Sequence, residues 1–345
     1  MKKRYKLIFC LLVLSLTLWS FGLADLAQAA TSKPLTKIKI SGGRVGDPWY
    51  ILSEALAYFI NHESEWLRAT VVATPGITGN AELAMKSPNE YIYVMEMGNY
   101  IHMQKDPYGK AYNYYNKCRF ISIQCSLTYT WVTLDKNIKT GKDLAGKTVG
   151  IKRKAAPYFT EVGVFKHWGI LDKVKLVGSG FGEAVKNLKD GLMDAAHMTF
   201  DHIYPAGFSK GAFITDLETR GPVYYISTEP EIIKKMYEEG IGADVAVRIP
   251  PGALDYKTQL NEVWCHAAPL FFAADERMDP DIVYEVTRVI WESAGKWDTW
   301  HPQGKHMTKD FIPASPIDLQ FVHPGAKKFY DERGIKLKKL GDLLR

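Results

Sequence analysis

Two hydrophobic periodicities alternate along the chain from residue 36 to about residue 200. Apolar side chains recur at every second position or in short runs in TKIKI, LRATVVAT and YIYVME, which predicts strands. Between these segments the apolar side chains fall three or four positions apart, as with Leu52, Leu56 and Phe59, which predicts helices. Strands that alternate with helices are typical of an α/β architecture with mostly parallel sheets.

The same reading extends over most of the chain. Further strands are predicted at 120–134, 147–152, 174–179, 193–200, 223–227 and 264–276. Helices are predicted at 49–62, 77–87, 160–170, 183–191, 231–240 and 279–295. Asp279 is the expected N-cap of the last helix, with Pro280 at its first position. The long apolar segment at 120–134 is expected to bend, and KTGKDLAGK predicts a short helical turn that ends at Gly146.

The N-terminus predicts export. MKKRYK is a basic head, LIFCLLVLSLTLWSFGL is an apolar run, and AQAA supplies small residues for cleavage after Ala29. An uncleaved membrane anchor is the alternative interpretation. We expect residues 1–29 to be a cleaved signal peptide and the mature protein to be soluble in the periplasm.

Charge and cysteine content limit the functions that the mature chain can have. The formal net charge falls from +6 to +3 without residues 1–29, because four basic residues and one acidic residue are removed. Neither this mild charge nor the pattern, which has no basic block, indicates a nucleic-acid partner. The remaining Cys118, Cys125 and Cys265 are odd in number and form no CxxC or Cys/His metal spacing. They predict buried free thiols and no metal site.

Six motifs occur in a recognisable order along the mature chain. They are SGGRVGDPWY, VVATPGITGNAELA, DLAGKTVGI, AVKNLKDGLMDAA, MDPDIVYEVTRVIWE and VHPGAKKFYDERG. In this order they resemble the solute receptors of TRAP transporters, specifically the TAXI family. Each motif alone is weak, but together they cover nearly the whole mature chain.

The resemblance implies an α/β fold of the two-lobe periplasmic binding protein class (type II), with a ligand cleft between lobes that hinge strands join. Lobe 1 is expected at 30–137 plus 241–345, and lobe 2 at 138–240. The implied function is capture of a small organic anion. The expected anion is a carboxylate, and an amino acid and an aromatic acid are the two narrower alternatives. A monomeric receptor would close over the anion and deliver it to membrane permease subunits that use an ion gradient, with no cofactor.

One segment departs from the resembled family. Where that family typically has a Gly/Ser-rich turn after the second-lobe strand, this chain has IKRKAAPYFTEVG. Three cations and two aromatic residues therefore stand where small residues usually leave backbone N–H groups open. This departure leaves the identity of the solute open.

Four clusters are candidates for binding. Gly-rich turns before helices present N–H groups to anions, and two such turns supply Gly43, Arg44, Val45, Trp49 and Tyr50, and then Gly76, Thr78 and Asn80. The unusual loop supplies Lys152, Arg153, Lys154, Tyr158, Phe159 and Thr160, and the end of a strand supplies His197, Thr199 and Asp201, with Glu96 as an addition. The alternatives are structural: a Trp49 packed in the core, Thr78 or Asn80 as helix caps, solvated cations and a structural His197.

An enzyme is the less favoured interpretation. GGRVGD fits neither GxGxxG nor the P-loop, and neither GxSxG nor HExxH occurs. A ligand-binding component of a periplasmic sensor would share the same cleft and differ only in its partner, so it stays open as the alternative.

Overall fold

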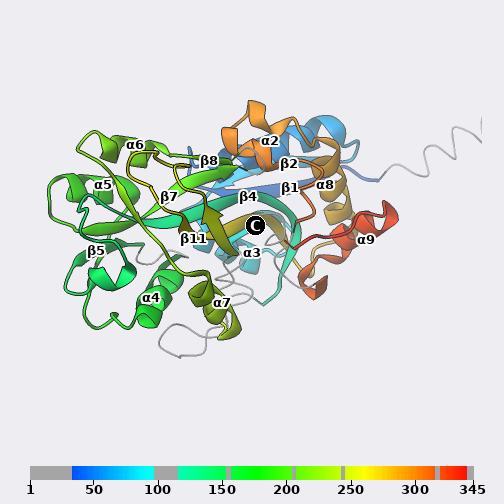
Figure 1. Cartoon of the computed structure of the whole chain (residues 1–345). Coiled ribbons are helices and arrows are strands. Elements are labelled where there is room, and N and C mark those ends of the chain that lie inside the picture. Colours follow the sequence, from blue (N-terminus) through cyan, green and yellow to red (C-terminus); the bar gives the residue numbers. More distant parts are fainter. Residues whose placement is uncertain are drawn as a thin grey trace, which may run out of the picture.

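Figure 1 shows a chain that is folded into two groups of elements on either side of long central strands. The computed structural model describes residues 33–96, 116–152, 157–203, 207–241, 245–314 and 319–339, and every structural statement below refers to these. The predicted signal peptide at 1–29 lies outside them. Within the described ranges, no helix is long and apolar enough to cross a membrane.

The first lobe is built from parallel strands and the helices between them. Strand β1 pairs in parallel with β2 on one side and with β3 on the other. The elements are β1 (Thr36–Gly43), α2 (Pro48–Glu63), β2 (Leu67–Ala73), α3 (Ile77–Lys86) and β3 (Tyr91–Glu96). All five agree with the predicted segments to within a few residues, because each combines clear periodicity with a Gly-, Pro- or Ser-containing boundary.

The second lobe repeats this plan with shorter elements. Strand β5 lies between β6 and β7 and is parallel to both. Its elements are β5 (Thr148–Ile151), α4 (Pro157–Trp168), β6 (Lys175–Gly178), α5 (Phe181–Lys189), β7 (Ala195–Ile203), β8 (Gly207–Ser209), α6 (Ala212–Glu218), β9 (Tyr224–Ile226) and α7 (Pro230–Glu238). The predicted turn before β5 is a 3₁₀ helix at Gly141–Leu144, and Gly146 then takes a φ of 81°.

Two long antiparallel strands join the lobes. Strands β4 (Cys118–Thr133) and β11 (Val263–Asp275) pair with each other, with β11 bonded to β3 and β4 bonded to β7. The resulting path through the sheet is β2-β1-β3-β11-β4-β7-β5-β6. Two register shifts between β4 and β11 give the irregularity that the sequence predicts for 120–134. The predicted α/β architecture, with two lobes joined by long strands, is confirmed.

The buried side chains form separate cores in the two lobes. The largest core combines residues of the first lobe with β11 and with α8 (Pro280–Glu292) and α9 (Pro324–Glu332), so both ends of the described chain pack on this lobe (Figure 1). Two smaller cores lie in the second lobe. A further core joins β10 (Val245–Ile249) to Phe200 and Phe208 of the second lobe. This core crosses the expected lobe limit at 240/241, and we keep the limits at 137/138 and 240/241 as a proposal.

Local predictions outside the parallel strands had mixed outcomes. The Asp279 side chain accepts a hydrogen bond from the Asp281 N–H at 2.8 Å, and Pro280 opens the helix, so the predicted N-cap is confirmed. Cys118, Cys125 and Cys265 are buried and form no disulfide, as expected. The short elements β8, α6 and β10 were not predicted, because three to seven residues carry too little periodicity to be read.

Helices α8 and α9 approach each other closely at Gly325. A Cβ atom on Gly325 would lie 2.1 Å from the Pro280 carbonyl oxygen, which is backbone and cannot rotate away. We expect Gly325→Ala to lower the free energy of unfolding by about 1–3 kcal/mol through overpacking. Gly221→Ala is the matched control, since nothing lies within 4 Å of its added methyl group. Urea denaturation of both variants tests this, and equal stabilities would show that the helices tolerate the methyl group.

Candidate functional site

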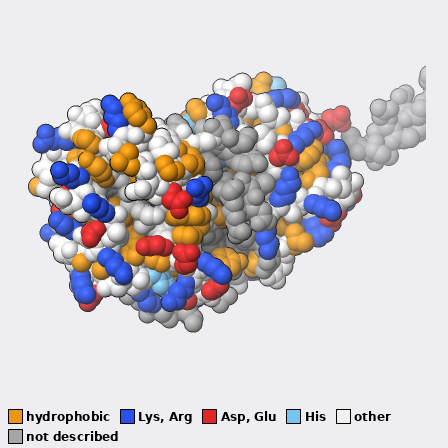
Figure 2. All heavy atoms as spheres, in the orientation of Figure 1, with side chains coloured by type: hydrophobic (Ala, Val, Ile, Leu, Met, Phe, Trp, Pro, Cys, Tyr) orange, Lys and Arg blue, Asp and Glu red, His pale blue; other side chains and the backbone are white. Residues whose placement is uncertain are grey.

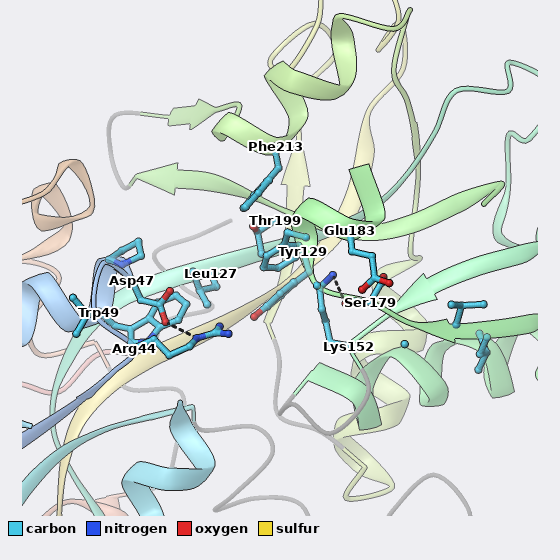
Figure 3. Close-up of a pocket in the computed structure, with 17 residues that line it drawn as sticks. Arg44, Asp47, Trp49, Leu127, Tyr129, Lys152, Ser179, Glu183, Thr199 and Phe213 are labelled. Atoms are coloured by element: carbon cyan, nitrogen blue, oxygen red, sulfur yellow. Dashed lines mark hydrogen bonds and ion pairs between the residues drawn. The ribbon is translucent and has the colours of Figure 1, made fainter. Parts of the chain in front are cut away.

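A cavity of about 1060 Å³ opens between the two lobes. Figure 3 shows Arg44, Asp47 and Trp49 of the first lobe on one side, and Lys152, Ser179 and Glu183 of the second lobe on the other. Tyr129 of β4 and Thr199 of β7 lie between them (Figure 3). The cavity therefore lies where the strand ends and helix starts of both lobes meet, which is the usual place for a ligand in an open α/β fold.

The opening turn of the first lobe forms one wall. Gly43 has a φ of 92°, and a Cβ atom there would lie 2.4 Å from Trp49 Nε1, so only glycine lets the turn fold over the indole. The Gln124 side chain of β4 donates to the Trp49 carbonyl at 3.1 Å and ties this turn to the connecting strand. Trp49 packs against the first core and also lines the cavity, so core packing and a place in the cavity wall are compatible.

Charge on this wall is balanced. The Arg44 side chain is 68% exposed, and its Nε donates to Asp47 Oδ2 at 3.2 Å. Asp47 is also the residue before α2, which begins with Pro48. An exposed pair of this kind stabilises little and can rearrange, so Arg44 can turn toward a ligand at small cost.

Lys152 dominates the opposite wall. It stands just after β5 and is only 8% exposed, although it lines the cavity. Its Nζ lies 3.8 Å from the centre of the Phe181 ring and 3.4 Å from the Ser179 carbonyl oxygen. Burial lowers the pKa of the Lys152 ammonium from 10.5 to about 8. The cation is thus held at the cavity by an aromatic face and one carbonyl.

Two fully buried groups lie behind Lys152. The backbone N–H of Lys152 donates to Glu161 Oε2 at 2.7 Å, and Glu161 Oε1 lies 2.5 Å from His197 Nδ1. Burial raises the pKa of Glu161 to about 8 and holds the pKa of His197 well below its usual value. His197 stacks on the Tyr129 ring, with 5.0 Å between the ring centres. His197 is therefore part of the floor of the site rather than of its surface.

The turn between β6 and α5 completes this wall, and sequence analysis did not select it. Helix α5 begins at Phe181 after Gly180, and no side chain caps it. Gly180 has no side chain that could accept the first N–H groups of the helix, and Glu183 lies within its first turn. The stretch VGSGFGEAV is a strand followed by a Gly-rich turn and a helix, the same signal that identified the opening turn. Leu127, Tyr129 and Phe213 also line the cavity without having been selected.

The predicted residues fall into three groups. The cavity brings together Arg44, Val45, Trp49, Lys152 and Thr199. Residues that do not line it are Gly43, Tyr50, Gly76, Thr78, Asn80, Glu96, Tyr158, Phe159, Thr160 and His197. Arg153, Lys154 and the side chain of Asp201 lie outside what the structure describes.

The second predicted cluster is used inside the first lobe. Helix α3 begins at Ile77 after Gly76, so Thr78 and Asn80 lie in its first turn, and the capping interpretation is wrong for both. Asn80 is fully buried, donates to the Val94 carbonyl at 2.9 Å and is hydrogen-bonded to Thr74. These bonds join α3 to β3, so Asn80 positions the helix on the sheet.

Aromatic residues of the unusual loop pack into the second lobe. Tyr158 contacts the core of that lobe and meets Phe159 edge to face, with ring centres 5.6 Å apart. The rings that line the cavity come instead from Trp49, Tyr129, Phe181 and Phe213. On the face seen in Figure 2, acidic and basic side chains of both lobes are interspersed.

Comparison with known proteins identifies one family. The model of the NMT1-like family matches residues 40–334, which is most of the chain. Among solved structures, a TctC solute binding protein from Polaromonas is 13% identical and has a TM-score of 0.48, over 79% of this chain and 90% of that one. The periplasmic aliphatic sulphonate binding protein SsuA from Escherichia coli is 11% identical with a TM-score of 0.43, over 90% and 92%. An ancestral arginine-binding protein bound to arginine is 13% identical with a TM-score of 0.44, over 77% and 97%.

A buried cation such as Lys152 lowers the stability of the fold. Because the folded state holds Lys152 with a lowered pKa, its charge destabilises the protein below pH 8, and this effect is relieved between about pH 8 and 10.5. We expect Lys152→Met to raise the free energy of unfolding at pH 6 by about 1–3 kcal/mol. Lys175→Met, on the exposed start of β6, is the control, with an expected change of at most about 0.5 kcal/mol. A less stable Lys152→Met protein would show that the cation supports the fold.

Proposed function

The chain belongs to the NMT1-like family, and from this premise we propose that it is a solute receptor that captures a small organic anion between its lobes. The observation that carries the proposal is the nearly buried Lys152 at an open cavity of about 1060 Å³. A buried cation without a full set of partners is costly, so its presence at a cavity favours an anionic occupant. The volume is at the upper end of small-molecule sites, which are about 300–1,000 Å³.

The chemistry of the walls narrows the class of anion. The Lys152 ammonium and the uncapped start of α5 suit a carboxylate or a sulfonate. Four aromatic rings line the cavity, from Trp49, Tyr129, Phe181 and Phe213, and suit a planar or apolar portion. The carboxylates of Asp47 and Glu183 also line it and suit an amine. Carboxylic acids with an aromatic or an amino group therefore fit best.

Closure follows from the position of these groups on different lobes. Arg44 and Trp49 lie on the first lobe, whereas Lys152 and Phe181 lie on the second. A ligand that contacts both walls binds the closed arrangement more tightly and shifts the population toward it. We place the hinge in β4 and β11, with lobe 1 at 30–137 plus 241–345 and lobe 2 at 138–240.

Delivery to a transporter is the second half of the proposal. Resemblance to the TAXI receptors supports a role in a TRAP transporter, in which permease subunits use an ion gradient to move the solute. A signal peptide at residues 1–29, cleaved after Ala29, would place the mature protein in the periplasm. A sensor component would bind the same anion in the same cleft and differ only in the membrane protein that it contacts.

Binding is tested with four probe acids: succinate, L-glutamate, phenylacetate and ethanesulfonate. We expect at least one to raise the melting temperature of the mature protein, because a ligand at 100 times its Kd stabilises the fold by about 2.7 kcal/mol. We also expect the acid to be recovered unchanged by mass spectrometry. Absence of any shift would contradict the proposed class of ligand, and formation of a product would contradict a receptor.

A further inference from the structure

The described walls of the cavity carry both signs of charge in equal number. Arg44 and Asp47 line it from the first lobe, and Lys152 and Glu183 line it from the second. Each wall therefore holds one cation and one carboxylate. Glu161 is also near the second wall, but it is fully buried and does not line the cavity. The formal charges that the described lining presents to a ligand thus sum to zero.

The two walls use their charges differently. On the first lobe, Arg44 Nε donates to Asp47 Oδ2 at 3.2 Å, so these two groups neutralise each other (Figure 3). On the second lobe, Glu183 is exposed in the first turn of α5, and it forms no hydrogen bond or salt bridge with any residue that the structure describes. Lys152 contacts an aromatic ring and a carbonyl oxygen. This wall therefore presents an ammonium and a carboxylate that are not bonded to each other.

An unpaired carboxylate beside the anion-binding cation limits what can bind. Glu183 is close enough to Lys152 to act on its charge through space. A ligand carboxylate that binds the Lys152 ammonium therefore also approaches Glu183, and the two like charges repel each other. A ligand that carries an ammonium group next to its carboxylate removes this repulsion, because the added cation can pair with Glu183.

We infer that the solute is a zwitterion of zero net charge, whose carboxylate binds Lys152 and whose ammonium group binds Glu183. Glu183 then distinguishes amino acids from simple acids. The inference rests on the proposed function, in which Lys152 binds the acidic group of the solute, and it narrows the class of ligand.

The remaining lining sets the side chain of this zwitterion. A second carboxylate on the ligand is disfavoured, because Arg44 could pair with it only by leaving Asp47 unpaired. Leu127 and the aromatic rings of the lining instead offer apolar surface in the same cavity. Neutral amino acids with an aromatic or a large apolar side chain therefore fit best.

The first test varies the charges on one ligand skeleton. L-Phenylalanine, 3-phenylpropionate and phenethylamine share a phenyl ring on the same two carbons, but the second lacks the ammonium group and the third lacks the carboxylate. Isothermal titration at pH 6 gives the Kd of each. We expect L-phenylalanine to bind about tenfold more tightly than 3-phenylpropionate, which leaves Glu183 unpaired, and more tightly than phenethylamine. Equal Kd values for L-phenylalanine and 3-phenylpropionate would overturn the inference.

The second test asks whether Glu183 causes this preference. We expect Glu183→Gln to bind L-phenylalanine about tenfold more weakly than wild type does, and to bind 3-phenylpropionate at least as tightly, because the repulsion is removed. Glu231→Gln is the matched control, since Glu231 lies in the first turn of α7 on the same lobe, is exposed and does not line the cavity. It should bind both ligands as wild type does. A purely structural role for Glu183 would weaken both ligands alike and would contradict the inference.

The two proposals fail in different ways. If 3-phenylpropionate or any of the four probe acids binds at least as tightly as L-phenylalanine, the receptor function stands and the inference is overturned. If L-phenylalanine binds and none of the four acids does, the broader class of organic anions is contradicted and the zwitterion is supported. If no acid binds, with or without an ammonium group, the proposed function fails and the inference fails with it. If Glu183→Gln does not fold, the wild-type comparison of L-phenylalanine with 3-phenylpropionate decides.

Discussion

An ammonium group that is almost removed from water organises the cleft of this protein. Lys152 stands at the end of β5, where its Nζ contacts the Phe181 ring and the Ser179 carbonyl, while its backbone N–H is bound by Glu161. These three partners belong to α5, to the turn before α5 and to α4, so the position of the cation depends on how the whole second lobe packs. Loss of hydration makes the ammonium unstable in isolation and ready to pair with an anion. In the proposed function, this local cost in stability is the source of affinity for an anion.

The connecting strands also hold the wall of the cavity that lies opposite Lys152, on the first lobe. Strands β4 and β11 run through both lobes, and β4 contributes Tyr129 to the cavity as well as Gln124, which holds the opening turn. Below the cavity, the Tyr129, His197 and His266 rings stack with centres 5.0–5.4 Å apart, so the floor consists of rigid, closely packed groups. In the proposed closure, the walls approach each other by bending at the strands while the floor keeps its arrangement. Capture by closure is consistent with this division into a rigid floor and two separate walls.

Periodicity predicted most of the fold, because the parallel strands and their helices bury whole faces and so leave regular patterns. The N-cap at Asp279 could also be predicted, because Asp followed by Pro is a local signal for a helix start. The site was harder to predict. Thr78 and Asn80 have the polar side chains expected of a binding turn. The Asn80 side chain instead forms hydrogen bonds with Thr74 and Val94 inside the lobe. Only the packed structure decides which polar residues face the cleft.

Residues that the sequence analysis missed illustrate the same limit. Tyr129 lies in a strand that is buried along almost its whole length, and nothing in its neighbours indicates that this position reaches the cavity. Phe213 lies on a helix of seven residues, which is too short to be read from periodicity. By contrast, the Gly-rich turn at 178–182 could have been found, because it repeats the strand, turn and helix order of the opening stretch. Proximity between turns that are far apart in sequence is a property of the two-lobe topology and carries no local signal.

The account depends on Lys152 as the residue that binds the acidic group of the solute. Isothermal titration of wild-type, Lys152→Met and Lys175→Met proteins at pH 6 with the most tightly bound probe acid tests this claim directly. Loss of a charge-assisted hydrogen bond is worth about 1.5–3 kcal/mol, so we predict that Kd rises by roughly 10- to 150-fold in Lys152→Met. Lys175→Met should bind as wild type does. Equal affinities in all three proteins would contradict the account.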